Sequence, residues 1–250
     1  MQKQEKEREG PPDARGDGVA VLFSGGVDST TVAVLAAERF KQVHLLTFNT
    51  GFLYNVDLSR KHVVTLKELF GDDAIRHELI DIRRIWRSVQ RTNVTTNLRR
   101  YRSWFILCMG CKLTMHAATI RYCREHGIHH AYGGENVCQG QYPEQKQVIL
   151  DELQDLYQDY DITYESPVYD YTSMEEDTKL QALGFRLGHH LKLFPSTKGS
   201  YHGTQPFCLA FPLYPFANTF PPEDTPVVEY LREHLHRARA FIENGHPGDV

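Results

Sequence analysis

Residues 19–29 read VAVLFSGGVDS, and this stretch decides the fold. Its five leading apolar residues are typical of a short strand that a parallel sheet buries on both faces. The two adjacent glycines then allow the backbone to turn tightly and to bring its amide groups close to a ligand. Residues 30–40 carry apolar side chains at the spacing of one helical face. The pattern predicts a strand, a glycine loop and a helix, in that order.

Strand and helix patterns alternate through the rest of the chain. We expect strands over residues 43–48, 74–82 and 128–132, and helices over residues 58–70, 112–126, 173–184 and 227–242. Ser173 and Glu176 have the spacing of a capping box at the start of one of these helices. Such alternation is typical of a doubly wound α/β fold, a parallel sheet with helices on both faces.

The two ends of the chain differ from this central region. Residues 1–18 are charged, contain Pro and Gly and lack a run of large apolar side chains, so we expect a flexible tail. Residues 19–185 form the predicted α/β domain. Residues 186–250 are predicted to be an irregular C-terminal extension with a terminal helix, packed on the same domain over the ligand edge of the sheet.

Composition excludes some classes of protein. The formal net charge of -4 argues against a wholly basic nucleic-acid binder. No apolar stretch reaches the length of a membrane span, and the N-terminus has no apolar signal-peptide core, so we expect a cytoplasmic protein without a membrane partner. Five cysteines in that compartment do not form a disulfide framework. Each is therefore interpreted as a core residue, a metal ligand or a nucleophile.

The glycine loop is suited to an anion. A helix that begins directly after the loop presents unpaired amides and the positive end of its dipole. No Gly-Lys-Ser or Gly-Lys-Thr follows, which excludes an ordinary Walker A loop. The hexapeptide SGGVDS, residues 24–29, instead resembles the signature of the PP-loop ATP pyrophosphatases, an adenine nucleotide alpha hydrolase-like superfamily with a Rossmann-like, HUP-type fold. The resemblance implies that the loop binds the pyrophosphate part of ATP and that the enzyme splits the α–β bond.

The same resemblance assigns residues to the site. The residues implied to bind or shape the pyrophosphate and Mg²⁺ site are Ser24, Gly25, Gly26, Asp28 and Ser29, with Asp28 also in a catalytic role. Asn49, with Thr50 and Gly51, lies where the superfamily places the nucleoside, and Gly133 and Gly134 lie at the expected topological switch point. The alternatives are a simple turn with Ser29 as helix N-cap, and a strand-ending turn at the second glycine pair.

Cys108 and Cys111 form a C-x-x-C pair at the start of a predicted helix, followed by Lys112. The helix dipole and Lys112 would favour thiolates, so these three residues are candidates for catalysis. A zinc site would need two further ligands, from Cys138, Cys208 or histidines. Cys108, Cys111 and Cys208 resemble in order the cysteines of some PP-loop tRNA thiolases, which implies a [4Fe-4S] cluster. The alternatives are a persulfide carrier and buried or incidental thiols.

A second resemblance points to different chemistry. Residues 140–143, GQYP, are similar to a glycine and tyrosine-proline segment of 7-cyano-7-deazaguanine synthases, which aminate a carboxylate through its adenylate. Those enzymes also carry a C-terminal four-cysteine zinc cluster. This chain has only Cys208 in that region. Cys123 and Cys138 are expected to be packing residues.

The strongest basic patch lies between Asp81 and Phe105 and contains three interleaved aromatic residues. Its arginines are Arg83, Arg84, Arg87, Arg91, Arg99, Arg100 and Arg102. Arginines contact phosphates and aromatic rings stack on bases, so the patch is a candidate surface for tRNA or a nucleotide-like substrate. A solvated helix face anchored by Trp86 is the alternative.

The sequence thus predicts an enzyme that adenylates a substrate and transfers sulfur to it, with tRNA favoured as acceptor. A sulfur donor protein and a second copy of the chain are further predicted partners. Two alternatives stay open: nitrogen transfer to a deazaguanine carboxylate, and a catalytically silent module that binds adenine nucleotides.

Overall fold

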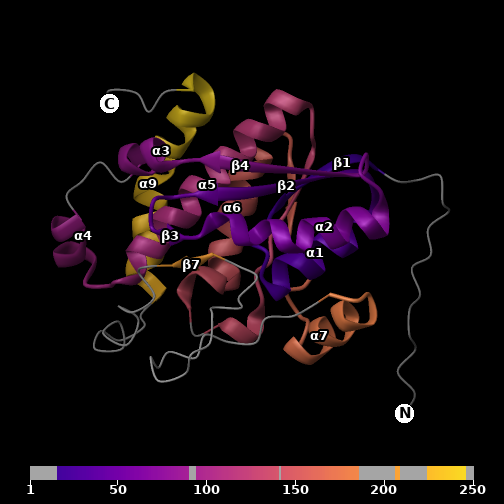
Figure 1. Ribbon diagram of the computed structural model, residues 1–250. Helices are drawn as coiled ribbons and strands as arrows, with labels where there is room; N and C mark the ends of the chain where they lie inside the picture. Colours follow the sequence, from indigo (N-terminus) through magenta and orange to yellow (C-terminus); the bar gives the residue numbers. More distant parts are fainter. Residues whose placement is uncertain (1–15, 90–93, 141, 186–205, 209–223, 246–250) are drawn as a thin grey trace, which may run out of the picture.

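The computed structural model describes residues 16–89, 94–140, 142–185, 206–208 and 224–245. Its centre is a five-stranded sheet in the order β4-β2-β1-β5-β6, in which every neighbouring pair is parallel (Figure 1). The strands are β1 (Gly16–Leu22), β2 (Phe40–Asn49), β4 (Ile75–Asp81), β5 (His130–Tyr132) and β6 (Thr163–Glu165). This arrangement confirms the predicted α/β fold.

Helices cover both faces of the sheet. One face carries α1 (Val27–Arg39), α2 (Arg60–Phe70) and α7 (Ser173–Ala182), and the other carries α5 (Phe105–His126), α6 (Gln147–Gln158) and α9 (Asp224–Asn244) (Figure 1). The short helices α3 (Arg83–Val89) and α4 (Val94–Tyr101) contact α5 and α9. Each face has its own apolar cluster. The sheet is therefore doubly wound.

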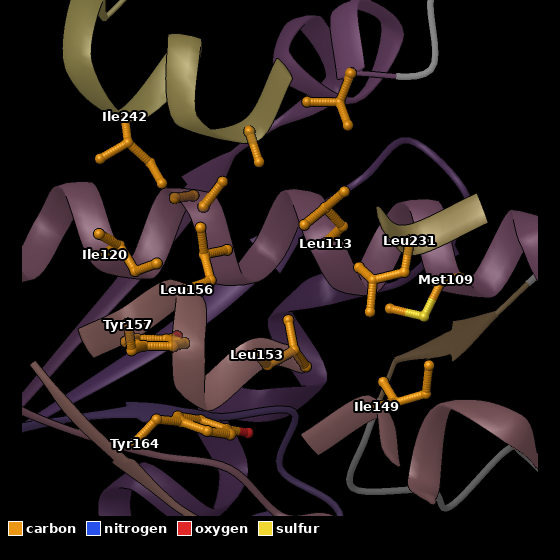
Figure 2. Packing of buried hydrophobic residues seen from close by; sticks show 14 of the residues in the cluster. Met109, Leu113, Ile120, Ile149, Leu153, Leu156, Tyr157, Tyr164, Leu231 and Ile242 are labelled. Atoms are coloured by element: carbon orange, nitrogen blue, oxygen red, sulfur yellow. The ribbon is translucent and has the colours of Figure 1, made fainter. Parts of the chain in front are cut away.

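The cluster under α5, α6 and α9 is the larger of the two (Figure 2). Leu113 and Ile120 of α5 belong to this cluster together with Leu153 and Leu156 of α6, and all four side chains are fully buried. Burial of each such side chain contributes about 1.5–3 kcal/mol to the hydrophobic driving force. The site described below rests on this rigid layer. None of the described helices is long and apolar enough to cross a membrane.

The strands β1 and β2 and the helices α5 and α9 begin earlier than predicted. β1 starts at Gly16, because Gly16 and Gly18 pair with β2 in register with the strand that follows. α5 starts at Phe105 and not at Lys112, because Phe105 and the next apolar residues pack into the core as a continuous helix. The C-x-x-C pair therefore lies inside a helix instead of at its beginning. Residues 1–15 of the tail expected over residues 1–18 lie outside the described residues, and residues 16–18 belong to β1.

Most of the expected irregular segment, residues 186–220, lies outside the described residues. A small part of it forms β7 (Phe207–Cys208), which pairs antiparallel with β3 (Leu53–Tyr54). Cys208 is opposite Leu53 in this pairing. β3 follows the end of β2, so Cys208 reaches the carboxyl edge of the main sheet. Three short 3-10 helices, Val56–Ser59, Val137–Gln139 and Pro143–Gln145, complete the described elements.

The cap of α7 is shifted by one residue from the predicted capping box. Thr172 is the N-cap residue: its hydroxyl accepts from the Glu175 amide at 3.3 Å, and its amide donates to the Glu175 carboxylate at 2.7 Å. The predicted pair, Ser173 and Glu176, was therefore wrong. Glu175 points into the cap and is exposed, whereas Glu176 is fully buried.

Candidate functional site

The glycine loop connects β1 to α1 at the carboxyl edge of the sheet. Gly25 has a φ of 79°, a conformation that glycine adopts without strain. Gly26 is the N-cap residue of α1, and among the described residues no side chain caps this helix. Ser29, which was considered as the N-cap, is the third residue of α1. Its hydroxyl donates to the Gly26 carbonyl at 3.2 Å. The first amides of α1 have no acceptor within the helix, which makes them candidate donors to a ligand.

Two serines hold the loop in shape. The Ser24 amide donates to the Ser29 hydroxyl at 3.2 Å, the two hydroxyl oxygens lie 3.0 Å apart, and the Gly26 amide donates to the Ser24 hydroxyl at 3.2 Å. Hydrogen bonds to the two serine side chains therefore hold the conformation of the loop. Open amides at a helix N-terminus favour a bound anion such as phosphate.

The second glycine pair lies against this loop. A Cβ atom at Gly134 would be 3.1 Å from the Ser29 backbone nitrogen and 3.4 Å from the Asp28 carbonyl carbon. The carboxyl end of β5 thus abuts the start of α1. β1 lies between β2 and β5, and its two flanking connections run on opposite faces of the sheet. The predicted switch point and the glycine loop therefore form one site.

At position 133 a glycine is required because buried polar side chains lie too close for a side chain there. Its amide donates to the Glu165 carbonyl at 2.9 Å. A Cβ atom here would be 1.9 Å from the Tyr164 hydroxyl oxygen and 2.2 Å from a carboxylate oxygen of Glu135. The turn after β5 is more than a strand end, because a buried polar network lies directly beneath it.

Glu135 is the centre of this network. Lys112 Nζ donates to Glu135 Oε1 at 2.8 Å and to the Glu144 carbonyl at 2.6 Å. Glu135 Oε2 accepts from the Tyr164 hydroxyl at 2.7 Å and from the Ser166 hydroxyl. Burial alone would raise the pKa of Glu135, but the charge of Lys112 and these hydrogen bonds lower it to about 2. Glu135 is therefore ionised at neutral pH.

His116 completes the network as a neutral side chain. Burial and the charge of Lys112 lower its pKa to about 3. Its Nδ1 lies 3.0 Å from the Tyr157 hydroxyl, and its Nε2 lies 4.0 Å from Glu135 Oε1. The Lys112 side chain is thus directed to Glu135 and away from the cysteines. Sequence reasoning placed Lys112 in the site but missed its carboxylate partner.

Asp28 has two neighbours that the sequence did not reveal as site residues. Gln139 Nε2 donates to Asp28 Oδ2 at 3.0 Å. Glu176 of α7 is fully buried, and neither of its carboxylate oxygens has a hydrogen-bond partner among the described residues. Burial, together with the contact and charge of Asp28, raises the pKa of Glu176 to about 9. The two carboxylates face each other at the start of α1.

The end of β2 carries the predicted nucleoside segment. The Asn49 side chain accepts a hydrogen bond from the Gly51 amide at 3.0 Å, which closes a turn in which Gly51 has a φ of 85°. A Cβ atom at Gly51 would lie 3.2 Å from the Arg83 side chain, which pairs with Asp81 at the end of β4. Nucleoside binding by Asn49 stays a prediction.

Cys111 does not have the expected thiolate character. Burial and the neighbouring Cys208 raise its pKa to about 12, although a contact with the Trp86 indole lowers it slightly. Cys111 is the seventh residue of α5, beyond the first turn in which a helix dipole acts. The structure does bring Cys111 and Cys208 together, as the sequence predicted.

The described residues contain no group of three His, Cys, Asp or Glu side chains placed to hold a metal ion. Cys108, Cys111 and Cys208 do not form such a group here, and the [4Fe-4S] or zinc site expected from them stays a prediction. Cys123 is buried, as expected. Cys138 is exposed and is not the packing residue that we expected.

The arginine stretch is partly neutralised. Arg100 pairs with Glu233 of α9 at 2.5 Å, and the same carboxylate accepts from the Tyr101 hydroxyl at 2.6 Å. Arg83 pairs with Asp81. Trp86 is half-buried and packs edge-on against Phe52, with ring centroids 4.8 Å apart. These contacts pair Arg83 and Arg100 with carboxylates of the fold, whereas the side chains of the described arginines stay exposed; Arg91 lies outside the described residues.

The doubly wound sheet, the open glycine loop and the second glycine turn define an adenine nucleotide alpha hydrolase-like protein of the PP-loop type. A family model described as "Queuosine biosynthesis protein QueC" matches residues 18–209. The chain therefore belongs to the QueC family.

A curated relative is the 7-cyano-7-deazaguanine synthase of Staphylococcus aureus (strain bovine RF122 / ET3-1), which is 36% identical over 62 residues. This match spans 25% of the chain and 26% of that relative's length. The NMN synthetase of Francisella tularensis has a TM-score of 0.49 at 13% identity, with 94% of this chain and 90% of that chain covered. The U34-tRNA thiolase NcsA of Methanococcus maripaludis, solved with its [4Fe-4S] cluster, has a TM-score of 0.44 at 15% identity. The match covers 89% of this chain and 72% of that chain. Neither structural likeness decides the activity.

Gly134→Ala tests the contact between the two glycine turns. The added methyl group presses on the Ser29 and Asp28 backbone, so we expect ATP affinity to fall about tenfold, or about 1.4 kcal/mol. The measurement is titration calorimetry with α,β-methylene-ATP. Gly18→Ala is the matched control, since its methyl group would make only ordinary contacts at 3.7 and 3.9 Å. Equal affinity in both variants would contradict this geometry.

Lys112→Met tests whether Lys112 is a support or a catalyst. It leaves the Glu135 carboxylate buried without its cation, which we expect to cost about 3–5 kcal/mol of unfolding free energy at pH 7. Glu135 has a lowered folded-state pKa, so its stabilising contribution is present above pH 4.5 and is lost as pH falls towards 2. The difference in unfolding free energy between wild type and variant, measured by urea unfolding, should therefore become smaller as the pH falls through that range.

The double variant Lys112→Met/Glu135→Gln removes the stranded charge and should recover part of the lost stability. A Lys112→Met protein as stable as wild type would instead make Lys112 a residue of the reaction and not of the scaffold.

Proposed function

We propose that the protein is an ATP-dependent ligase that adenylates a carboxylate and then transfers nitrogen to it, with release of pyrophosphate and AMP. The observation that carries the proposal is the open loop from Ser24 to Ser29 in a chain that the QueC model matches over residues 18–209. Of the two transfers predicted from the sequence, the family match favours nitrogen transfer. It lends no support to sulfur transfer or to tRNA as acceptor.

ATP would lie along the carboxyl edge of the sheet. The amides at the start of α1 would donate to the β- and γ-phosphates, and the adenosine would extend towards the end of β2 near Asn49. Mg²⁺, when bound with ATP, would neutralise phosphate charge and polarise the α-phosphorus. Asp28 offers the carboxylate that such an ion prefers, at the mouth of the loop.

The proposed reaction has two displacements. A carboxylate oxygen of the substrate attacks the α-phosphorus, the bond between that phosphorus and the bridging oxygen breaks, and pyrophosphate leaves. Ammonia then attacks the acyl carbon of the acyl-adenylate, AMP leaves with the carboxylate oxygen, and nitrogen loses a proton to form an amide. The loop contributes by holding the leaving phosphates in line and stabilising their charge.

The relative's name includes a cyano group, which requires one further step. An amide becomes a nitrile by formal loss of water, and water is a poor leaving group without activation. A second ATP can activate the amide oxygen at the same loop, after which loss of AMP and a proton leaves the nitrile. No step in this sequence needs a thiolate, in agreement with the raised pKa of Cys111.

The substrate proposed from the relative's name is a carboxylated 7-deazaguanine. Phe52 is 39% exposed and packs against Trp86 next to the Gly51 turn, and this aromatic pair is a surface on which a planar ring could stack. The resembling synthases carry a four-cysteine zinc cluster near the C-terminus, and in this sequence Cys208 is the cysteine found in that region.

Isotope transfer tests the adenylation directly. The protein is incubated with ATP, ammonia and 7-carboxy-7-deazaguanine labelled with ¹⁸O in its carboxylate. We expect one ¹⁸O atom in each AMP released during the first step, detected by mass spectrometry, because the carboxylate oxygen stays on the α-phosphorus. Unlabelled AMP with ¹⁸O retained in the acid would mean that ATP is only hydrolysed.

Cys111→Ser separates nitrogen from sulfur transfer in the same assay. Under the proposed reaction the variant keeps its yield of labelled AMP and amide. The opposite result has two parts: the variant forms no product, and wild type forms product only when sulfide is supplied. That result would indicate a thiolase.

A further inference from the structure

The neighbour of the buried Glu176 side chain is a second carboxylate, Asp28, and neither a cation nor a hydrogen-bond donor offsets its burial among the described residues. The side chain is fully buried, and both of its carboxylate oxygens lack a hydrogen-bond donor among the described residues. The neighbouring Glu175 satisfies the helix cap, so Glu176 is not needed there. An ionised carboxylate removed from water without a partner is costly, and proteins keep such a group only when it meets a proton or a cation.

The carboxylate is directed to the glycine loop. Asp28, the second residue of α1, lies within hydrogen-bonding reach of Glu176. Gln139 donates to Asp28 Oδ2, which leaves Oδ1 available. Asp177 and Glu175 add further negative charge close by. No cationic side chain forms an ion pair with Asp28 or Glu176 among the described residues. Two carboxyl groups therefore lie together beside the glycine loop without a cation to offset them.

We propose that Glu176 and Asp28 together ligate the divalent cation that accompanies ATP, so that Glu176 is a metal ligand of the active site. The inference rests on the proposed binding of ATP at the loop. Mg²⁺ is commonly held by one or two carboxylates together with substrate phosphates, and not by a site made of protein alone. Two carboxylates facing an open phosphate site match that pattern. The cation site is complete only when the nucleotide is present.

The position of Glu176 is set before any ligand binds. The Thr172–Glu175 capping box fixes the start of α7, and Lys179 of α7 pairs with Glu38 of α1 at 3.1 Å. α7 also packs along α1. Both carboxylates therefore belong to helices that are held against each other. Preorganisation of this kind lowers the cost of binding the ion.

The test measures metal binding, not turnover. Mn²⁺ replaces Mg²⁺ as a paramagnetic probe, and electron paramagnetic resonance counts free Mn²⁺ in the presence of saturating α,β-methylene-ATP. Glu176→Gln keeps the size of the side chain and removes its charge, so we expect about tenfold weaker Mn²⁺ binding to the nucleotide complex. Asp177→Asn, the same change on the next residue, should stay within about twofold of wild type, since a nearby unligated charge contributes little.

A second arm separates ligation from simple charge. Without metal, removing a negative charge beside the phosphates should leave nucleotide binding unchanged or make it tighter. If the Glu176→Gln variant binds Mn²⁺ as tightly as wild type, or more tightly, the proposal is overturned. A proton shared between the two carboxylates would then explain the burial of Glu176. Wild-type protein that binds no nucleotide would instead overturn the proposed function, and this inference with it.

Wild-type protein supplies an independent check should Glu176→Gln fail to fold. Mn²⁺ bound in the nucleotide complex broadens nearby nuclear resonances. The side-chain carboxyl ¹³C signal of Glu176 should disappear along with that of Asp28, while that of Glu152 on α6 should persist. A sharp Glu176 signal in the Mn²⁺ complex would exclude ligation.

Discussion

The structure depends on a close backbone contact between the start of α1 and the turn after β5. Gly134 allows this contact because a side chain at that position would press on the Ser29 nitrogen. The contact keeps the first amides of α1 facing the carboxyl edge of the sheet, uncapped by any described side chain. A helix start normally finds a capping partner, so one that is held open at a sheet edge is available to phosphate.

Support for that contact comes from the buried network beneath it. Lys112 of α5 and Glu135 of the turn after β5 form an ion pair with 8% and 7% of their side chains exposed, and Tyr164 of β6 donates to the same carboxylate. Three elements are thus tied together directly under the second glycine pair. Both charges lose their hydration on burial, which offsets most of the free energy gained from their attraction. A buried pair of this kind therefore contributes little net stability, and its main effect is to favour one arrangement of the three elements. The basic residue next to the C-x-x-C pair thus pairs with the carboxylate under the glycine turn, and burial keeps the Cys111 thiol protonated.

The sequence predicted the parallel sheet and the loop because their signals are local: apolar runs, adjacent glycines and helical spacing. α6 was missed, although Ile149, Leu150, Leu153, Leu156 and Tyr157 have helical spacing and are all buried. The ion pair of Lys112 with Glu135 joins residues 23 apart, and Glu176 meets Asp28 across two helices, so no local pattern could reveal either. Two overlapping capping-box spacings also made Glu176 look like a helix cap.

The account rests on one claim, that the backbone from Gly25 to Ser29 binds the phosphates of ATP. Titration of ¹⁵N-labelled protein with α,β-methylene-ATP and Mg²⁺ tests it most directly, since amides that donate to phosphate shift strongly downfield. The account predicts that the largest shifts occur at Val27, Asp28 and Ser29, with a smaller change at Gly134. Saturable binding that leaves these amides unmoved and shifts another surface would contradict it.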